Sequence, residues 1–285
     1  MEKYVVLDKK VGETPLSCAE EWRAKHPEFV GVPLAYAGRL DPMASGKLLV
    51  LIGEECKKQT EYHNLDKTYE FSILFGIESD SLDVLGRLNV CKPSSDIQLE
   101  NWVGLGLAPR SAQFESSYIT TVIEKFVGNI ELPYPKFSAK TVKGKPLHMW
   151  TLEGRLDEIE IPTKKSEVFE LTLTGIETVE KSEMVRQALE KVNSIPEVTD
   201  QRKALGNDFR RTDVRADWNK IFNDNSLPSE FTIANFICTA SSGTYMRTLA
   251  YEIAKKLGTC GLAWRIHRTH IGHYSKETLD WKLEY

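Results

Sequence analysis

The sequence has few cysteines and lacks long apolar runs. No apolar stretch in its 285 residues approaches the length of a membrane-spanning helix, and residues 1–8 show no apolar region of a signal peptide. The cysteines are odd in number and without metal-ligand spacing, which favours reduced thiols over a disulfide framework. They are Cys18, Cys56, Cys91, Cys238 and Cys260. These absences argue against a membrane protein and a secreted disulfide scaffold, so we expect a cytoplasmic protein.

An excess of positive charge is also absent. The net charge is −4 at pH 7, which argues against indiscriminate nucleic-acid binding but allows a local basic surface. Residues 136–145 and residues 255–276 are basic and contain no acid. A basic run is most often a solvated face, yet two such runs in an acidic chain favour phosphate binding. The candidate phosphate contacts are Lys136, Lys140, Lys143, Lys145, Arg265 and Arg268.

What the chain does contain is a globular composition, with 41% hydrophobic and 27% charged residues. Alternating or largely apolar segments predict strands at residues 3–8, 47–53, 68–76, 168–174 and 231–239. Capping signals and apolar residues at helical spacing predict helices at residues 14–25, 119–127 and 246–257. Because this order lacks regular βαβ alternation, we expect an α+β fold with a large mixed sheet in a single domain spanning residues 1–285.

Residues 178–229 differ from their surroundings because charges of both signs dominate them. Helix-like pieces occur near residues 183–192, so we expect a helical insertion between two strands. The composition of this segment indicates no function. The simplest interpretation is a decoration of the surface.

One short segment combines a carboxylate with two glycines. The segment Gly38–Gly46 reads Gly-Arg-Leu-Asp-Pro-Met-Ala-Ser-Gly and carries Asp41 at its centre. A residue before proline avoids helical dihedral angles, so we expect Asp41 in an extended or turn conformation. The two glycines allow a backbone or a ligand to come close. By itself, the pattern is typical of a surface turn.

Two further residues allow both a structural and a functional interpretation. Arg247 lies near the start of its predicted helix, where a positive charge opposes the helix dipole. Such an arginine is either exposed without a partner or held by a specific anion. Tyr69 begins the apolar face of its predicted strand, so it either packs in the core or forms an aromatic platform beside a site.

Six motifs taken together resemble those of the TruB family of tRNA pseudouridine synthases. Residues 38–46 look like the family signature G-x-L-D-P-x-A-[ST]-G, and residues 66–69 resemble its D-K-x-Y motif. The other resemblances lie at residues 75–83, 135–147, 242–249 and 266–272. They occur in the family's order and cover most of residues 3–275 apart from the expected insertion, so the combination is very specific.

This resemblance implies a pseudouridine synthase fold, with a large mixed, mainly antiparallel sheet flanked by helices. It implies isomerisation of uridine to pseudouridine in the T loop of tRNA, at uridine 55. Asp41 would be the catalytic carboxylate, acting as a nucleophile at C1′ or as a base at C2′. Arg247 would pair with that charge, and Tyr69 would stack on the extruded uracil. The substrate-binding residues implied by the resemblance are Tyr36, Tyr245 and Ile266.

The resemblance also implies which partners to expect. The T arm of tRNA is the expected partner, and no cofactor, metal, membrane or obligate protein partner is needed. We expect a monomer. Few residues follow Gly272, so we expect the C-terminal RNA-binding PUA domain of most bacterial members to be absent.

Departures from the family pattern bear on the RNA target and leave alternatives open. Tyr36 stands where the family usually has a histidine, and Arg39 is more typical of ribosomal-RNA pseudouridine synthases. The alternatives are a tRNA-folding chaperone of the same fold without turnover, and a synthase that acts on ribosomal RNA. A metal site is a weaker hypothesis, because no carboxylate or thiolate accompanies its candidate ligands. These candidates are His267, His270 and His273.

Overall fold

The computed structural model describes residues 2–91, 116–197 and 210–285. The strands of the first of these ranges are β1 (Tyr4–Lys9), β2 (Leu34–Tyr36), β3 (Ser45–Ile52), β4 (Asp66–Phe75), β5 (Ile77–Ser79) and β6 (Leu88–Val90). The later strands are β7 (Gly128–Pro133), β8 (Thr141–Val142), β9 (Lys145–Pro146), β10 (Thr163–Glu180), β11 (Glu230–Ala240), β12 (Gly261–Ser275) and β13 (Asp280–Glu284). The α-helices are α1 (Pro15–Ala24), α2 (Gln59–His63), α4 (Ser116–Ile123), α5 (Leu147–Leu152), α6 (Lys181–Ser194), α8 (Arg211–Asn223) and α9 (Met246–Lys256).

Nine of the described strands form one mixed sheet. The strand order is β1-β3-β12-β4-β11-β10-β7, and β2 and β13 pair with β3 and β12. Every pair in this sheet is antiparallel except β3 with β12. The described part of the chain therefore confirms the expected α+β class and the large, mainly antiparallel mixed sheet.

The main hydrophobic core is built on the long central strands and helix α9. Phe71 of β4 and Phe236 of β11 are register partners, and their stacked rings lie 5.2 Å apart. Helix α9 packs on β12 and β4 and buries Leu249 and Ile253 completely. Because each such side chain contributes about 1.5–3 kcal/mol when it is fully buried, this packing fixes the start of α9 relative to the sheet.

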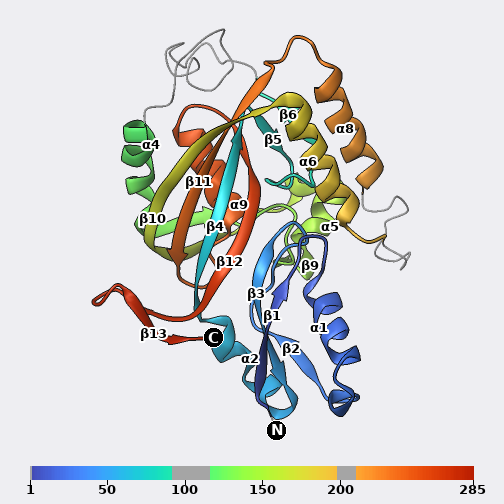
Figure 1. Ribbon diagram of the computed structural model, residues 1–285, viewed down its shortest axis with the longest axis vertical. Coiled ribbons are helices and arrows are strands. Elements are labelled where there is room, and N and C mark those ends of the chain that lie inside the picture. The colour runs from blue at the N-terminus through green and yellow to red at the C-terminus, as the bar shows by residue number, and fades with distance from the viewer. Residues whose placement is uncertain (1, 92–115, 198–209) are drawn as a thin grey trace.

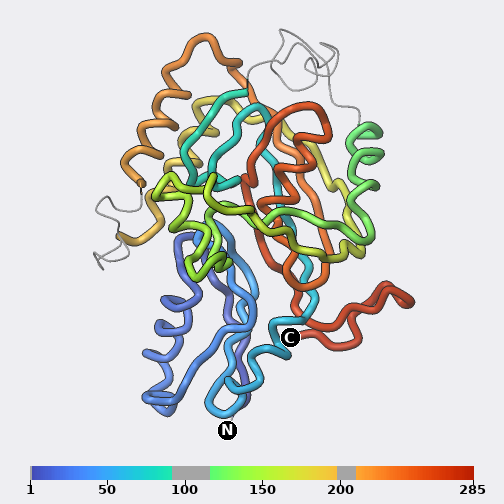
Figure 2. Tube along the Cα trace, turned by 180° about the vertical axis from the view of Figure 1, so that it is seen from behind, coloured from blue at the N-terminus to red at the C-terminus, as the bar shows by residue number. Residues whose placement is uncertain are grey.

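The N-terminal segment forms a separate lobe at the bottom of Figure 1, made of β1, β2, β3 and α1. Thr14 caps α1 as expected: its Oγ1 accepts from Ser17 N at 3.0 Å, and Pro15 occupies the first turn. Figure 2 shows that the C-terminal end returns to this lobe, where the Tyr285 ring lies 5.1 Å from the Tyr4 ring.

Two elements differ in length from the sequence prediction. The helix expected at residues 119–127 is α4, which ends at Ile123 and is followed by a 3₁₀ turn at Glu124–Phe126. The chain must leave the helix because Gly128 already pairs with Val168 of β10. The strand expected at residues 168–174 is longer, because one end of β10 pairs with β7 and the other with β11.

The segment expected to decorate the surface contributes to the core instead. Its helices α6 and α8 lie side by side at the upper right of Figure 1. Both bury apolar residues in the main core, and the decoration hypothesis is therefore wrong. These residues are Met184, Val185, Ala188, Val192, Val214, Trp218 and Ile221. That the segment is an insertion stays a prediction.

The expectation of reduced thiols is wrong for two of the cysteines. Cys91 and Cys260 form a disulfide between Cα atoms 6.1 Å apart, whereas Cys18, Cys56 and Cys238 are free. Cys91 and Cys260 are 169 positions apart in the sequence, and nothing in their spacing indicated that they would pair. Among the described helices, none is long and apolar enough to cross a bilayer.

Candidate active site

The loop that carries Asp41 is held in place by hydrogen bonds to its backbone carbonyls. Ala44 N donates to the carbonyl of Asp41 at 3.0 Å, which closes a turn around Pro42. Gly12 N donates to the Pro42 carbonyl at 2.8 Å, and buried Lys9 donates through Nζ to the Ala44 carbonyl at 2.5 Å. The predicted turn conformation is therefore correct, and the turn is anchored rather than free.

Gly46 ends this loop at a very close approach to β12. Its φ is +102°, and a Cβ atom built there would lie 2.2 Å from the carbonyl oxygen of Arg268. Only glycine fits both the dihedral angle and the space. The Arg268 side chain is buried, with 1% exposed, and donates from Nε to the Lys47 carbonyl at 2.7 Å and from Nη2 to the Gly38 carbonyl at 3.3 Å. Arg268 therefore holds the two ends of this loop together through these hydrogen bonds.

Asp41 and Arg247, which lie 206 positions apart in the sequence, meet in the structure. Arg247 Nε donates to Asp41 Oδ2 at 2.8 Å. The arginine side chain is only 4% exposed, whereas the Asp41 side chain is 39% exposed. The ion pair therefore has a buried cation and a carboxylate that a ligand can reach.

All three guanidinium nitrogens of Arg247 have acceptors. Nη1 donates to the Ser81 carbonyl at 2.7 Å, and Nη2 donates to the Phe137 carbonyl at 3.2 Å. Burial by itself lowers the pKa of Arg247, but the charges of Asp41 and Asp83 outweigh burial, and the pKa ends above its usual value. Arg247 is therefore a fixed positive charge at the start of α9, in agreement with the sequence-based expectation of an anionic partner.

Asp83 is a second carboxyl group at this site that the sequence analysis did not single out. It lies 3.6 Å from Arg247 Nε, is 6% exposed, and accepts at Oδ1 from Ser81 Oγ at 2.6 Å and from Leu85 N at 2.9 Å. Burial raises its pKa, against the opposing effects of the Arg247 charge and the Ser81 hydrogen bond. The only feature of the sequence that pointed to Asp83 was its position at the end of the motif at residues 75–83.

The three aromatic candidates are all half-buried and lie on different elements. Tyr245 immediately precedes α9 and is half-buried; its ring lies 5.5 Å from that of Tyr134, and burial raises its pKa. Tyr69 is half-buried on β4, where Arg268 of β12 is its register partner. Tyr36 is half-buried at the end of β2, and the Arg39 guanidinium lies 6.0 Å from its ring.

The remaining candidate residues divide into exposed and buried groups. Ile266 is buried in the main core with 4% exposed, so its role in a uracil pocket stays a prediction. Arg268 must be corrected from a phosphate contact to a support of the loop, because its guanidinium is buried. The other phosphate candidates are exposed or half-buried, namely Lys136, Lys140, Lys143, Lys145 and Arg265. Two of them are already paired, since Lys145 lies 2.6 Å from Glu153 and Arg265 lies 3.2 Å from Glu70.

The candidate metal ligands on β12 have other contacts. His267 Nδ1 shares a hydrogen bond with Ser45 Oγ at 2.9 Å, and His270 stacks on Trp281 with ring centres 5.7 Å apart. Within the described residues, the one group of three metal-ligating side chains is Glu78 with the disulfide-bonded Cys91 and Cys260. The geometry therefore gives the histidine metal site no support.

Known proteins similar to this chain agree with the motifs. The family model described as "TruB family pseudouridylate synthase (N terminal domain)" matches residues 32–189, which include Asp41, Tyr69 and Asp83. The tRNA pseudouridine synthase B of Caldicellulosiruptor saccharolyticus is 28% identical over 272 residues, which cover 95% of this chain and 68% of that protein. The proteins of the same name from Aquifex aeolicus and Shouchella clausii are 24% and 27% identical, with 97% and 95% of this chain covered and 71% and 67% of theirs.

One solved structure aligns along the chain at low similarity. It is titled "Crystal Structure of a Cbf5-Nop10-Gar1 Complex" and shares 15% identity over 95% of this chain and 49% of that chain, with a TM-score of 0.46. The family model covers more than half of the 285 residues, so the sequence matches alone carry the family assignment.

Proposed function

The chain belongs to the TruB family of pseudouridylate synthases, and we propose that it isomerises uridine 55 in the T loop of tRNA. The observation that carries this proposal is the contact of 2.8 Å between Asp41 in the signature loop and buried Arg247. The relatives that match along 95% of the chain are named tRNA pseudouridine synthase B, which supports tRNA as the substrate class.

The reaction is an isomerisation in which atoms and electrons balance within the nucleotide. The bond from N1 of uracil to C1′ breaks, the base turns, and C5 forms a new bond to C1′. The proton on C5 leaves and N1 gains one, so no redox partner is consumed. A carboxyl group that attacks C1′ or removes a proton from C2′ must be ionised, and Asp41 supplies this carboxylate in the proposal.

Arg247 supports this role of Asp41 in two ways. Its positive charge favours the ionised carboxylate, which desolvation by a bound nucleotide would otherwise disfavour. Its hydrogen bond from Nε fixes one carboxylate oxygen, because the other two guanidinium nitrogens are held by backbone carbonyls. The carboxylate therefore approaches the sugar in a fixed orientation, which lowers the entropic cost of reaching the transition state.

The substrate uridine must leave its stack to reach a carboxylate in an anchored loop. In this proposal, Tyr69 stacks on the extruded base and Tyr245 and Ile266 line its pocket. The exposed Lys136, Lys140 and Lys143 contact phosphates, which position an RNA loop without specifying its sequence. We propose a cytoplasmic monomer with no obligate protein partner.

A tRNA transcript made without modifications tests the proposal. The wild-type protein should form pseudouridine at position 55, mapped by carbodiimide labelling, and Asp41→Asn should form none while it still binds the transcript. Asp8→Asn, which removes an exposed carboxylate in the same lobe, is the matched control and should be fully active.

Other outcomes identify the alternatives. Binding of tRNA by the wild-type protein without any product would favour the chaperone hypothesis. Product in ribosomal RNA but not in tRNA would change the target. Product formed by Asp41→Asn would remove Asp41 from the chemistry.

A further inference from the structure

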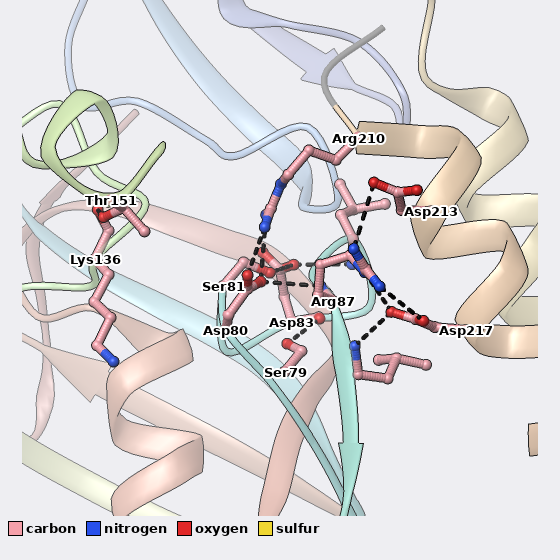
Figure 3. A network of polar contacts seen from close by, with 12 residues as sticks. Ser79, Asp80, Ser81, Asp83, Arg87, Lys136, Thr151, Arg210, Asp213 and Asp217 are labelled. Carbon is pink, nitrogen blue, oxygen red and sulfur yellow. Dashed lines mark hydrogen bonds and ion pairs between the residues drawn. The ribbon is translucent and has the colours of Figure 1, made fainter. Parts of the chain in front are cut away.

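Hydrogen bonds and an ion pair join helix α8 to the loop of residues 80–87, which connects β5 and β6 (Figure 3). Arg87 donates from Nε to Asp217 Oδ2 at 2.6 Å and from Nη2 to Oδ1 at 3.2 Å. Trp218 Nε1 donates to the Val84 carbonyl at 3.1 Å. The loop therefore has its position set by a helix that none of the family motifs contains.

The same loop holds the arginine of the candidate active site. It supplies the Ser81 carbonyl to Arg247 Nη1 and the Asp83 carboxylate at 3.6 Å from Nε. The third acceptor, the Phe137 carbonyl, belongs to a different segment of the chain. The orientation of Arg247 toward Asp41 therefore depends on the spacing between the loop and Phe137.

Arg210 contacts both of these segments at once. Its Nη1 donates to Asp80 Oδ2 at 2.5 Å and its Nη2 to Oδ1 at 3.3 Å. Its guanidinium carbon lies 4.2 Å from the centre of the Phe137 ring. The same Asp80 carboxylate accepts from Arg87 N at 2.9 Å, so it also closes the loop. One side chain thus bridges the two backbone segments whose carbonyls hold Arg247.

The chemistry of this bridge requires an arginine. A planar guanidinium can bind a carboxylate with two nitrogens and stack its face on an aromatic ring at the same time. A lysine ammonium in the same place can keep the charge pair but not both contacts. The Arg210 side chain is 20% exposed, so water screens the pair less than it screens a fully exposed one.

We propose that Arg210 is a positioning residue for the isomerisation. It clamps Asp80 against Phe137 and so holds the Ser81 and Phe137 carbonyls at the spacing that points Arg247 at Asp41. Its kinetic consequence rests on the proposed function, whereas its effect on the geometry of Arg247 does not.

The kinetic test measures single-turnover pseudouridine formation and tRNA affinity separately. Because a misplacement of about 1 Å can cost about 100-fold in rate, Arg210→Ala should lower the single-turnover rate by about 10- to 100-fold. The Kd for tRNA should stay within about threefold of the wild-type value, a difference of about 0.7 kcal/mol. Arg210→Lys should recover part of the rate.

Arg215→Ala is the matched control, on the helix that Arg210 immediately precedes. Arg215 donates from Nε to Asn193 Oδ1 on α6 at 2.7 Å, so its loss removes an equal charge without a change at Asp80. This control should keep the wild-type rate. Asp80→Asn should act like Arg210→Ala, and the double variant should be no slower than the slower single variant, because residues that act as one unit are not additive.

A second measurement needs no enzymatic turnover. The Nε–Hε signal of Arg247 in a ¹⁵N spectrum, identified by its loss in Arg247→Lys, reports the hydrogen bond to Asp41. Arg210→Ala should shift or broaden this signal, and Arg215→Ala should leave it unchanged.

The outcomes separate this proposal from the proposed function. A wild-type protein that makes no pseudouridine refutes the function, and the Arg247 signal then decides the positioning role. An unchanged signal and rate in Arg210→Ala overturn the proposal. A wild-type rate with weakened tRNA binding would make Arg210 an RNA contact instead.

Discussion

Replacement of Arg247 by lysine is the most demanding test of the site. Lysine keeps the positive charge but has a single nitrogen, whereas Arg247 donates to Asp41, Ser81 and Phe137 from three separate nitrogens. An ammonium that stays with the carboxylate leaves the buried Ser81 carbonyl and the half-buried Phe137 carbonyl without this donor. An unsatisfied buried acceptor costs about 1–3 kcal/mol, so the two losses together should lower the free energy of unfolding by about 2–6 kcal/mol.

The catalytic loss should be larger than the stability loss alone implies. Without its carbonyl anchors the ammonium no longer fixes the carboxylate, and a shift of about 1 Å lowers the rate by about 100-fold. Urea denaturation measures the first quantity. Release of tritium from C5 of labelled uridine in tRNA, under single-turnover conditions, measures the second.

A half-buried arginine away from the site, Arg215, provides the control for this substitution. Arg215→Lys should change the unfolding free energy by less than about 0.5 kcal/mol, as is usual for surface positions. If Arg247→Lys is equally mild in stability and rate, then the three hydrogen bonds do not hold the site, and the role assigned to the buried cation is wrong.

Three further predictions concern the scaffold. Lys67 is buried, and burial lowers its pKa to about 7. Above pH 7 the folded protein has therefore lost a proton that the unfolded chain keeps up to about pH 10, so the free energy of unfolding should rise between pH 7 and pH 9. Lys67→Met should remove about 2 kcal/mol of that rise, as measured by urea titrations at several pH values. Arg268→Ala should lower the melting temperature and the turnover rate, because the loop loses its hydrogen bonds from this side chain. The dependence of tRNA affinity on salt concentration should stay unchanged, whereas a weaker dependence would show that Arg268 contacts a phosphate after all. Gly46→Ala should destabilise the protein by more than about 1 kcal/mol in the same titrations, because the Cβ would collide with the Arg268 backbone at 2.2 Å; a neutral result would show that the loop shifts freely.

The sequence predicted the pairing of Asp41 with Arg247 better than it predicted the residues that hold this pair in place. Motif order and the opposed helix dipole both indicated an anionic partner for Arg247, and the structure places Asp41 there at 2.8 Å. Asp83 was missed because a carboxylate in a serine-rich turn is ordinary until a buried arginine is found beside it. Arg210 could not be predicted, since its partners come from two distant segments and depend on tertiary packing.

Two of the wrong predictions, for Arg268 and for residues 178–229, could have been avoided from the spacing of apolar residues in the sequence. Arg268 lies two positions after buried Ile266 on one strand, so strand periodicity already placed it on the inner face. In the charged segment of residues 178–229, Met184, Ala188 and Val192 recur every four residues, which is the spacing of a buried helix face. Charge content concealed both patterns. The pairing of Cys91 with Cys260 had no such signal.

The parallel ladder between β3 and β12 is only two register pairs long, at Ser45 with His267 and at Gly46 with Arg268. The other strands of the N-terminal lobe, β1 and β2, pair only with β3. This ladder begins four residues after Asp41, but Leu40, Met43 and Ala44 of the same loop are also buried in the main core. That core includes Leu249 of α9, the helix that carries Arg247. A displacement of the lobe that drew the Asp41 carboxylate away from the Arg247 guanidinium would therefore also have to open the main hydrophobic core.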